Sequence, residues 1–402
     1  MERAVVVCNV FPDDNKGGCA ITQQTIDWLK RSYPGHDVHL IPVEQNRDYD
    51  EMQYRFTLRR HPDVRVLRCP VRAGRSPLGT ARELARSLWW LWMPPGHSEF
   101  EGTLSRAELV VGKGGYVFVE RETLRGLLSL WFTAYPLVYA ASKGTRTVVL
   151  CATIGPFRRA GSRLLSRWIL RRIDLVVTRD PISTAEAKKL GCTSVMECPD
   201  ITFTLDPERI QGAGPFAIPA ETYAVMVVSA ERGRRDDEFL DRLRTLAGLL
   251  LDEKTVERVV VVVQSTEDAQ LSTRFVERCG DPRITLMMED LAPEELMGFY
   301  AAAGLVITKR LHAGLFSMMA GTPVLMFSTD GLKSDGILRQ IELTDRLLPY
   351  PDFSVDEAYR RIREILEGGE AEVERVRETL GRGRREAERV LDEVAAALRV
   401  TA

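Results

Sequence analysis

Short apolar runs alternate with amphipathic, helix-length segments along almost the whole chain, and this alternation restricts the fold more than any other feature. Strands that alternate with helices pair in parallel, and the helices then cover both faces of the sheet. The predicted strands are residues 4–10, 38–41, 64–67, 109–111, 147–151, 175–177, 194–197, 223–229, 259–263, 284–287, 305–307 and 324–327. The predicted helices include residues 20–31, 164–172, 184–190, 237–251, 293–302 and 313–320. The sequence therefore predicts an α/β protein built on parallel sheets.

The chain is long enough for two such sheets. Its 402 residues exceed what one hydrophobic core usually supports. Prolines and glycines accumulate without periodicity between residues 206 and 222, which indicates a linker. We therefore predict two Rossmann-like, doubly wound domains that face a cleft, formed by residues 1–208 and 220–370. Residues 371–402 form a predicted C-terminal helix, which either packs back on the first domain or remains a solvated, salt-bridged tail.

Composition argues against several classes of function. A net charge of −2 disfavours a mainly electrostatic nucleic-acid binder. The seven cysteines form no CxxC pair, which predicts free thiols, a cytoplasmic location and no structural zinc. No apolar segment reaches the roughly 18 residues that a membrane-spanning helix needs. Two aromatic stretches, residues 88–93 and 127–141, are predicted as buried helices. The alternative is an aromatic face against a membrane surface or a lipid-linked substrate.

The strongest candidate for chemistry is Thr308-Lys309-Arg310-Leu311-His312. It joins a predicted buried strand to a predicted helix, and the N–H groups and partial positive charge of a helix N-terminus suit an anion. A lysine, an arginine and a histidine in so short a span are not expected in a hydrophobic core. His312 is the candidate proton carrier. Lys333 follows the next predicted strand, so parallel pairing would bring it to the same cluster.

Further polar residues follow other predicted strands. Arg179 follows strand 175–177, and its guanidinium suits a carboxylate or a phosphate, so we predict a role in ligand binding; the alternative is a surface pair with Asp180. Three glycine-containing turns are weaker candidates, because plain tight turns also need glycine. They contain Asn15, Gly17 and Gly18; Lys113 and Gly114; and Gly155.

These motifs, in this order, resemble those of the polysaccharide pyruvyl transferase family. The resemblance covers most of the chain. It is carried by Asn15-Lys16-Gly17-Gly18-Cys19-Ala20, Gly112-Lys113-Gly114-Gly115, Ile154-Gly155-Pro156, Thr178-Arg179-Asp180 with Pro199-Asp200, and Arg310-Leu311-His312-Ala313 followed by Gly321-Thr322-Pro323. It implies a fold similar to that of the GT-B glycosyltransferases, with the acceptor on the first domain and the donor on the second.

The resemblance also implies an activity. Phosphoenolpyruvate would be the co-substrate, one or two hydroxyls of a saccharide the acceptor, and a pyruvate ketal and phosphate the products, with no metal or other cofactor. By the family pattern, the catalytic residues are His312, Arg310 and Arg179. The predicted substrate-binding residues are Lys309, Leu311, Lys333, Asn15, Gly17, Gly18, Lys113, Gly114 and Gly155.

Gly18 departs from the family pattern, which has an acidic residue in its place. Two alternatives stay open, of which the second rests on this departure. One is a GT-B glycosyltransferase with a nucleotide-sugar donor, whose diphosphate would need the same cations. The other is a non-catalytic family member that binds saccharides or anions. The resemblance also leaves open whether the acceptor is lipid-linked or free.

Overall fold

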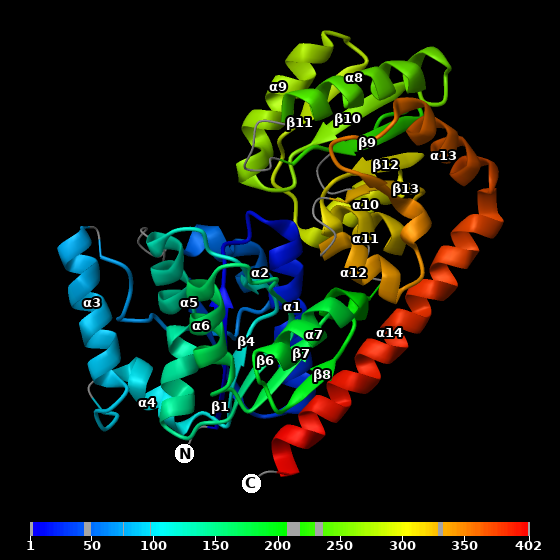
Figure 1. Cartoon of the computed structure of the whole chain (residues 1–402). Coiled ribbons are helices and arrows are strands. Elements are labelled where there is room, and N and C mark those ends of the chain that lie inside the picture. Colours follow the sequence, from blue (N-terminus) through cyan, green and yellow to red (C-terminus); the bar gives the residue numbers. More distant parts are fainter. Residues whose placement is uncertain are drawn as a thin grey trace. The chain divides into compact units, whose positions relative to one another are not determined.

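The computed structural model describes residues 3–43, 50–74, 76–96, 98–206, 218–229, 236–328 and 333–400. They form two compact units, coloured along the chain in Figure 1. The first unit consists of Met1–Asp13, Gly18–Thr204 and Arg385–Ala402, and the second of Asp14–Gly17 and Leu205–Arg384. Most of the predicted linker, residues 207–217, lies outside the described residues.

A parallel sheet forms the centre of the first unit, which confirms the predicted fold class there. Its described strands run in the order β3-β2-β1-β4-β6-β7-β8, and β5 pairs with β6. Their bounds are β1 Ala4–Val10, β2 Asp37–Pro42, β3 Arg65–Val66, β4 Leu109–Gly112, β5 Gly115–Phe118, β6 Thr147–Ile154, β7 Leu175–Thr178 and β8 Val195–Glu197. The strand order reverses between β1 and β4, which makes this place the switch point of the sheet.

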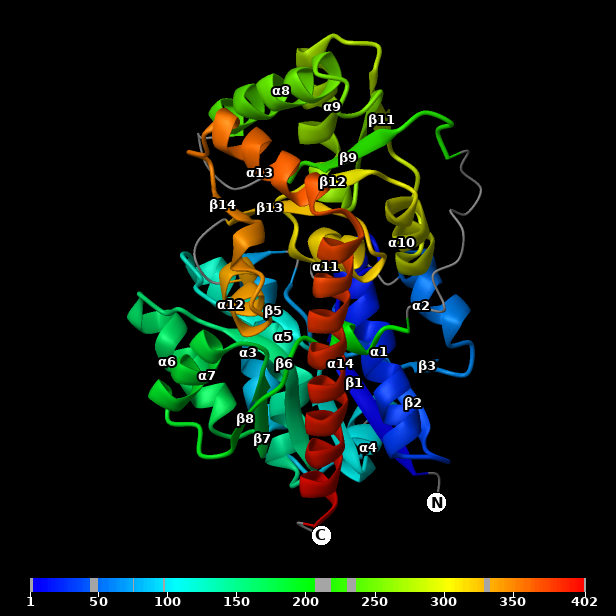
Figure 2. The ribbon, with the colours of Figure 1, turned by 90° about the vertical axis from the view of Figure 1, so that its right-hand side faces the viewer.

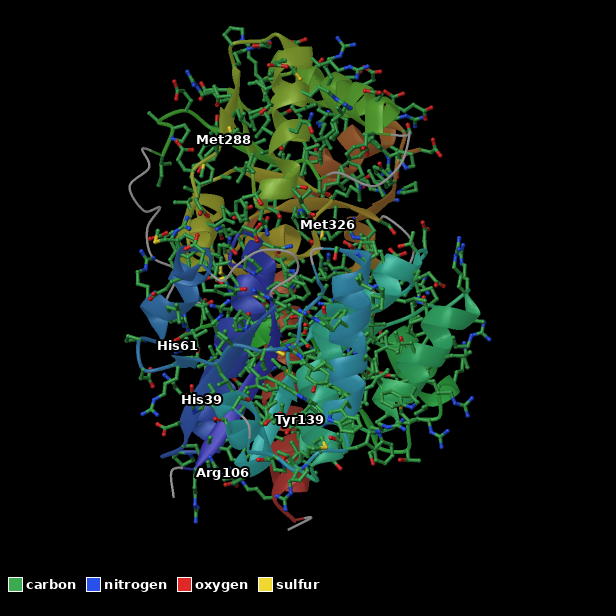
Figure 3. The ribbon with its side chains drawn as sticks, turned by 90° about the vertical axis from the view of Figure 1, so that its left-hand side faces the viewer. His39, His61, Arg106, Tyr139, Met288 and Met326 are labelled. Atoms are coloured by element: carbon green, nitrogen blue, oxygen red, sulfur yellow. The ribbon has the colours of Figure 1, made fainter. Side chains whose placement is uncertain are left out.

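The core of the first unit is rich in aromatic side chains. The helices described here are α1 Lys16–Ser32, α2 Arg55–Arg60, α3 Pro77–Trp90, α4 Glu99–Arg106, α5 Leu124–Ser142, α6 Ala160–Leu170 and α7 Pro181–Lys189. Helix α5 is buried from Leu130 to Ala140, so the prediction of a buried helix in the second aromatic stretch is confirmed. The ring of Tyr135 lies 6.5 Å from that of Phe100 on α4, and the ring of Tyr139, which Figure 3 labels, lies 5.9 Å from it.

The first aromatic stretch corrects the sequence prediction. Helix α3 packs on α5 through one face only, where Trp131 donates its indole N–H to the Oγ atom of Ser87 at 2.9 Å. Trp89 on the helix and Trp92 directly after it are 64% and 89% exposed. A helix that packs as an outer layer needs one apolar stripe, so the prediction of a fully buried helix here was wrong.

The second unit has its own parallel sheet, with the strand order β11-β10-β9-β12-β13-β14. The strands are β9 Tyr223–Val227, β10 Arg258–Val262, β11 Ile284–Met287, β12 Leu305–Thr308, β13 Val324–Ser328 and β14 Leu347–Pro349. The helices are α8 Asp236–Asp252, α9 Ala269–Cys279, α10 Pro293–Ala301, α11 Leu311–Met319, α12 Lys333–Gln340 and α13 Val355–Glu367. In chain order this is the 3-2-1-4-5-6 arrangement of a Rossmann sheet, and its switch point lies between β9 and β12.

The last helix, α14 (Gly369–Val400), contributes to both units and is the long red helix of Figure 2. Its first half groups with the second unit, where Glu372 accepts from the buried guanidinium of Arg346. Its second half groups with the first unit, where Trp28 donates its indole N–H to the carbonyl oxygen of Leu391 at 3.2 Å. Among the described residues, no helix is long and apolar enough to cross a membrane.

Candidate functional site

The predicted site residues follow strands of the two sheets. In open parallel sheets, ligands bind beyond the carboxyl ends of the strands, at the switch point. Lys309 and Arg310 follow β12 in the second unit, and Lys113 follows β4 in the first. Each group therefore lies at the expected edge of its own sheet.

Arg310 is held in place by two acidic residues. It directly precedes α11, and its Nε donates to Oδ2 of Asp268 at 2.5 Å. Its Nη2 donates to Oδ1 of Asp268 at 2.7 Å and to Glu267 at 2.6 Å. Burial, the largest single influence, lowers the pKa of Arg310, but the hydrogen bonds and negative charges of Asp268 and Glu267 together outweigh it, so this pKa lies above its ordinary value. Nη1 makes no hydrogen bond with the described residues, which leaves it available to a ligand.

Lys309 connects the two strands at the switch point of the second unit. Its side chain is buried, and its Nζ donates to the carbonyl oxygen of Ser229, which follows β9, at 3.3 Å. The same Nζ lies 3.6 Å from the ring centroid of Tyr350, a cation–π contact. Leu311 is buried and begins α11. These two residues position the turn between β12 and α11.

His312 lies in the first turn of α11, with its ring 6.1 Å from that of Phe316. Gly17, which belongs to the second unit, lies directly against this ring, and a Cβ atom at Gly17 would overlap the Nδ1 and Cγ atoms of His312. The neighbouring Lys16 is buried and pairs with Asp290. The first residues of α1 therefore form part of the same site as the turn before α11.

The two glycines of the first motif correct the sequence prediction. We expected Gly17 and Gly18 in a loop before a helix that begins at residue 20, whereas α1 begins at Lys16 and contains both. Gly17 is needed within the helix and not in a turn, because only the absence of a Cβ atom lets the His312 ring lie against the backbone there. Asn15 directly precedes α1.

Lys113 joins the end of β4 to α1. Its Nζ donates to the carbonyl oxygen of Gly18 at 2.9 Å and to Oγ1 of Thr22 at 3.1 Å. Burial lowers the pKa of Lys113 to about 8. The next residue, Gly114, has no space for a side chain, because a Cβ atom would overlap the carbonyl oxygens of Leu150 and Cys151. Both residues of this motif therefore have structural roles at the switch point of the first unit.

Arg179 has a structural partner that its sequence position did not reveal. Its Nη1 donates to Oδ2 of Asp200 at 2.6 Å and its Nε donates to Thr153 at 2.7 Å. Both Arg179 and Asp200 are buried. The alternative of a surface pair between Arg179 and Asp180 was therefore wrong, because Asp180 is also buried and caps α7, where its carboxylate accepts from the backbone N–H of Ser183. Arg179 belongs to the first unit and Arg310 to the second, so neither unit brings both together.

The last two predicted residues lie at the ends of strands. Gly155 follows β6 with a φ of 71°, a left-handed conformation that favours glycine. Its N–H donates to the carbonyl oxygen of Phe118 at 2.8 Å, so it serves a turn. Lys333 is the first residue of α12, after β13 as predicted, and its side chain lies outside the described part of the structure.

Asn9 is a candidate site residue that the sequence analysis did not single out. It lies near the end of β1, at the switch point of the first unit, with a left-handed φ of 63°. Its amide is buried, and neither Oδ1 nor Nδ2 has a hydrogen-bond partner among the described residues. An unpaired buried polar group costs roughly 1–3 kcal/mol, and strained residues of this kind gather at functional sites. An asparagine within the apolar run AVVVCNV is the signal that could have revealed it.

No group of three or more histidine, cysteine, aspartate or glutamate side chains in the described ranges could hold a metal ion.

A family model described as polysaccharide pyruvyl transferase matches residues 15–331, which is most of the chain. The chain belongs to this family. The motifs that carried the resemblance lie within the matched residues. A comparison with curated proteins finds no match to the sequence.

Solved structures support the fold. A glycosyltransferase from Rickettsia africae has a TM-score of 0.61 at 9% identity, over 99% of this chain and 98% of its own. The complex of S. aureus MnaA with UDP has a TM-score of 0.60 at 12% identity, over 99% and 97%. The Phytolacca americana UGT2 complexed with UDP-2-fluoro-glucose and pterostilbene has a TM-score of 0.55 at 15% identity, over 99% of both chains. At these identities the likeness concerns the fold alone, which is that of the GT-B glycosyltransferases.

Proposed function

We propose that this polysaccharide pyruvyl transferase takes its pyruvyl group from phosphoenolpyruvate and forms a pyruvate ketal on two hydroxyls of a saccharide. The observation that carries the proposal is the arrangement at the end of β12, where Arg310 is fixed by Asp268 beside His312. Phosphoenolpyruvate carries a carboxylate and a phosphate, and a guanidinium with one open edge suits either.

One of the two carboxylates that pair with Arg310 has to leave it when an anionic substrate binds. Asp268 is fully buried and stays with Arg310, whereas the side chain of Glu267 is 68% exposed. An exposed ion pair is worth at most about 1 kcal/mol, so an incoming phosphate or carboxylate displaces Glu267 at little cost. We expect Nη1 and Nη2 of Arg310 then to face the anion, while Nε and Asp268 keep the guanidinium oriented.

His312 is the proposed acid of the reaction. Its proton goes to the methylene carbon of phosphoenolpyruvate, which becomes the methyl group, and an oxocarbenium-like centre forms at the neighbouring carbon. One saccharide hydroxyl attacks this centre and the second displaces phosphate, so that two C–O bonds form and one breaks. Of the two hydroxyl protons released, one restores His312 and the other leaves with phosphate. The cations near β12 stabilise the leaving phosphate.

Phosphate release tests the proposal. Purified protein is incubated with phosphoenolpyruvate and a panel of free and lipid-linked saccharides, and products are identified by mass spectrometry as a gain of one pyruvyl group. We expect His312→Ala to lose turnover while it still binds phosphoenolpyruvate in a thermal-shift measurement. The control is Arg274→Lys, because Arg274 is an exposed residue of the second unit that pairs with Asp237. This variant should release phosphate as fast as the wild type. Unchanged phosphate release by His312→Ala would refute the role of His312.

A nucleotide-sugar donor is the second candidate, because two of the similar structures are complexes with UDP or a UDP-sugar. The diphosphate of such a donor could use the same arginine. Thermal shift with phosphoenolpyruvate, UDP-sugars and GDP-sugars separates the two, since stabilisation by nucleotides alone would exclude phosphoenolpyruvate as donor. A cytoplasmic location, inferred from the cysteine pattern, forms part of the same proposal.

A further inference from the structure

Helix α3 presents large apolar side chains to solvent. Its inner face packs on α5 through Ser87, as described above. The outer face and the residues directly after the helix are exposed by 83% at Leu78, 44% at Leu88, 64% at Trp89 and 89% at Trp92. A single exposed apolar side chain is ordinary, but two tryptophans and two leucines on one short segment form a patch that marks a contact surface.

The segment that contains the neighbouring helix α6 is strongly basic. Residues 157–173 contain no acidic residue and six arginines, which are Arg158, Arg159, Arg163, Arg167, Arg171 and Arg172. All six are exposed, and Leu164 among them is 63% exposed. Glu120 contacts this segment, but through the backbone N–H groups of Arg158 and Arg159. The positive charge is therefore local, since the whole chain has a net charge of −2.

Both helices belong to one surface because both contact the same side chain. Trp131 of α5 bonds to Ser87 of α3, and its ring lies 5.6 Å from that of Trp168 on α6. In Figure 1, α3 and α6 lie on the same side of the sheet as α5, and Figure 3 views the molecule from that side. We term this the α3–α6 surface, formed by Leu78, Leu88, Trp89, Trp92, Leu164 and the six arginines.

We propose that the α3–α6 surface docks on a lipid bilayer that carries anionic headgroups. Tryptophan favours the interface between headgroups and acyl chains, and an exposed arginine gains roughly 1 kcal/mol near an anionic membrane. A second copy of the chain fits less well, because a symmetric contact would set six arginines against six arginines. This proposal concerns location and does not depend on the donor or acceptor of the proposed reaction.

Co-sedimentation with vesicles tests the proposal. We expect the wild type to bind vesicles of phosphatidylcholine with phosphatidylglycerol, to bind pure phosphatidylcholine weakly, and to lose binding as salt rises. The variant Arg163→Gln/Arg167→Gln/Arg171→Gln should bind the anionic vesicles on the order of a hundredfold more weakly, as three lost charges imply. Trp89→Ser/Trp92→Ser should bind at least about tenfold more weakly while it keeps its salt dependence.

Matched controls come from the second unit. Arg360→Gln/Arg363→Gln removes exposed arginines that pair with glutamates, and Met288→Ser removes a side chain that is 57% exposed (Figure 3). Both should bind vesicles as the wild type does, and thermal unfolding should show that all variants are folded. The proposal would be overturned if the wild type bound both vesicle types equally, or if the arginine variant bound the anionic vesicles as tightly as the wild type. It would also be overturned if the wild type bound neither vesicle type and instead dimerised or bound nucleic acid.

Discussion

Asp268 binds Arg310 side-on, with its two carboxylate oxygens 2.5 and 2.7 Å from Nε and Nη2 of the guanidinium. The pairing fixes the plane of the arginine before any ligand arrives, and it uses one edge of the guanidinium only. Arg179 and Asp200 form a comparable buried pair after β7 in the first unit. In both units, therefore, a carboxylate orients the arginine that the family motif contributes.

The role of Asp268 is testable because its neighbour Glu267 provides an internal control. Asp268→Asn keeps the size of the side chain but loses the charge that orients Arg310, and a small misplacement costs up to about 100-fold in rate. We expect kcat/KM for phosphoenolpyruvate to fall roughly 10- to 100-fold, mainly through KM. Glu267→Gln should keep or improve it, since the exposed carboxylate competes with the anion. An equal loss in both variants would show that Asp268 has no special orienting role.

A methyl group at Gly17 should disturb His312 directly. Gly17→Ala forces the His312 ring to move, because the added Cβ overlaps Nδ1 and Cγ. We expect turnover to fall by on the order of 100-fold with phosphoenolpyruvate binding reduced much less. Gly248→Ala on α8 is the matched control, because an added Cβ there meets no atom within 4 Å. It should stabilise the protein by about 0.5–1 kcal/mol and leave activity unchanged. Wild-type activity of Gly17→Ala would argue against a catalytic His312.

Burial of Lys113 predicts how stability depends on pH. Its pKa is about 8 in the folded protein and 10.5 as the ordinary value, so the unfolded chain binds more protons between these limits. The contribution of Lys113 to the free energy of unfolding should therefore rise from pH 8 to pH 10.5, by about 3 kcal/mol at most. Lys113→Met lacks this contribution. Urea unfolding at pH 7.5 and pH 10 should show the wild type gaining stability relative to the variant, and parallel pH profiles would contradict the buried charge.

Substitutions at Asn9 can separate the effect of its left-handed backbone on stability from the effect of its side-chain amide on activity. Asn9→Gly keeps the left-handed backbone accessible and removes the amide, so the protein should be no less stable than the wild type. Lys254→Gly, at an exposed residue with φ 54°, is the control for backbone relief alone. We expect both variants to unfold at or above the wild-type urea midpoint, and only Asn9→Gly to lose acceptor turnover, by about tenfold or more. A destabilised Asn9→Gly would indicate that the amide has a bonding role in the folded chain.

The sequence predicted the parallel α/β fold because alternation of apolar runs and helices leaves few other solutions. It also placed Lys309 and Arg310 at a strand end, because charged residues directly after a buried strand have few other uses. The sequence could not reveal contacts between residues that lie far apart along the chain. The pairing of Asp200 with Arg179, and of Asp268 with Arg310, becomes visible only when the fold brings these distant residues together. Likewise, the glycine pair looked like a turn, since a contact between Gly17 and His312 cannot be read from local pattern.

Helix α14 has a consequence for how the protein is made. The first unit takes its last helical segment from residues 385–400, and Trp28 is already bonded there to Leu391. Domains generally fold in the order of synthesis, the N-terminal one first. Here the helical segment that completes the N-terminal unit is synthesised after the last residue of the second unit. The second unit is thus the one that can finish folding first, and a chain stopped after residue 384 leaves the earlier-made half incomplete.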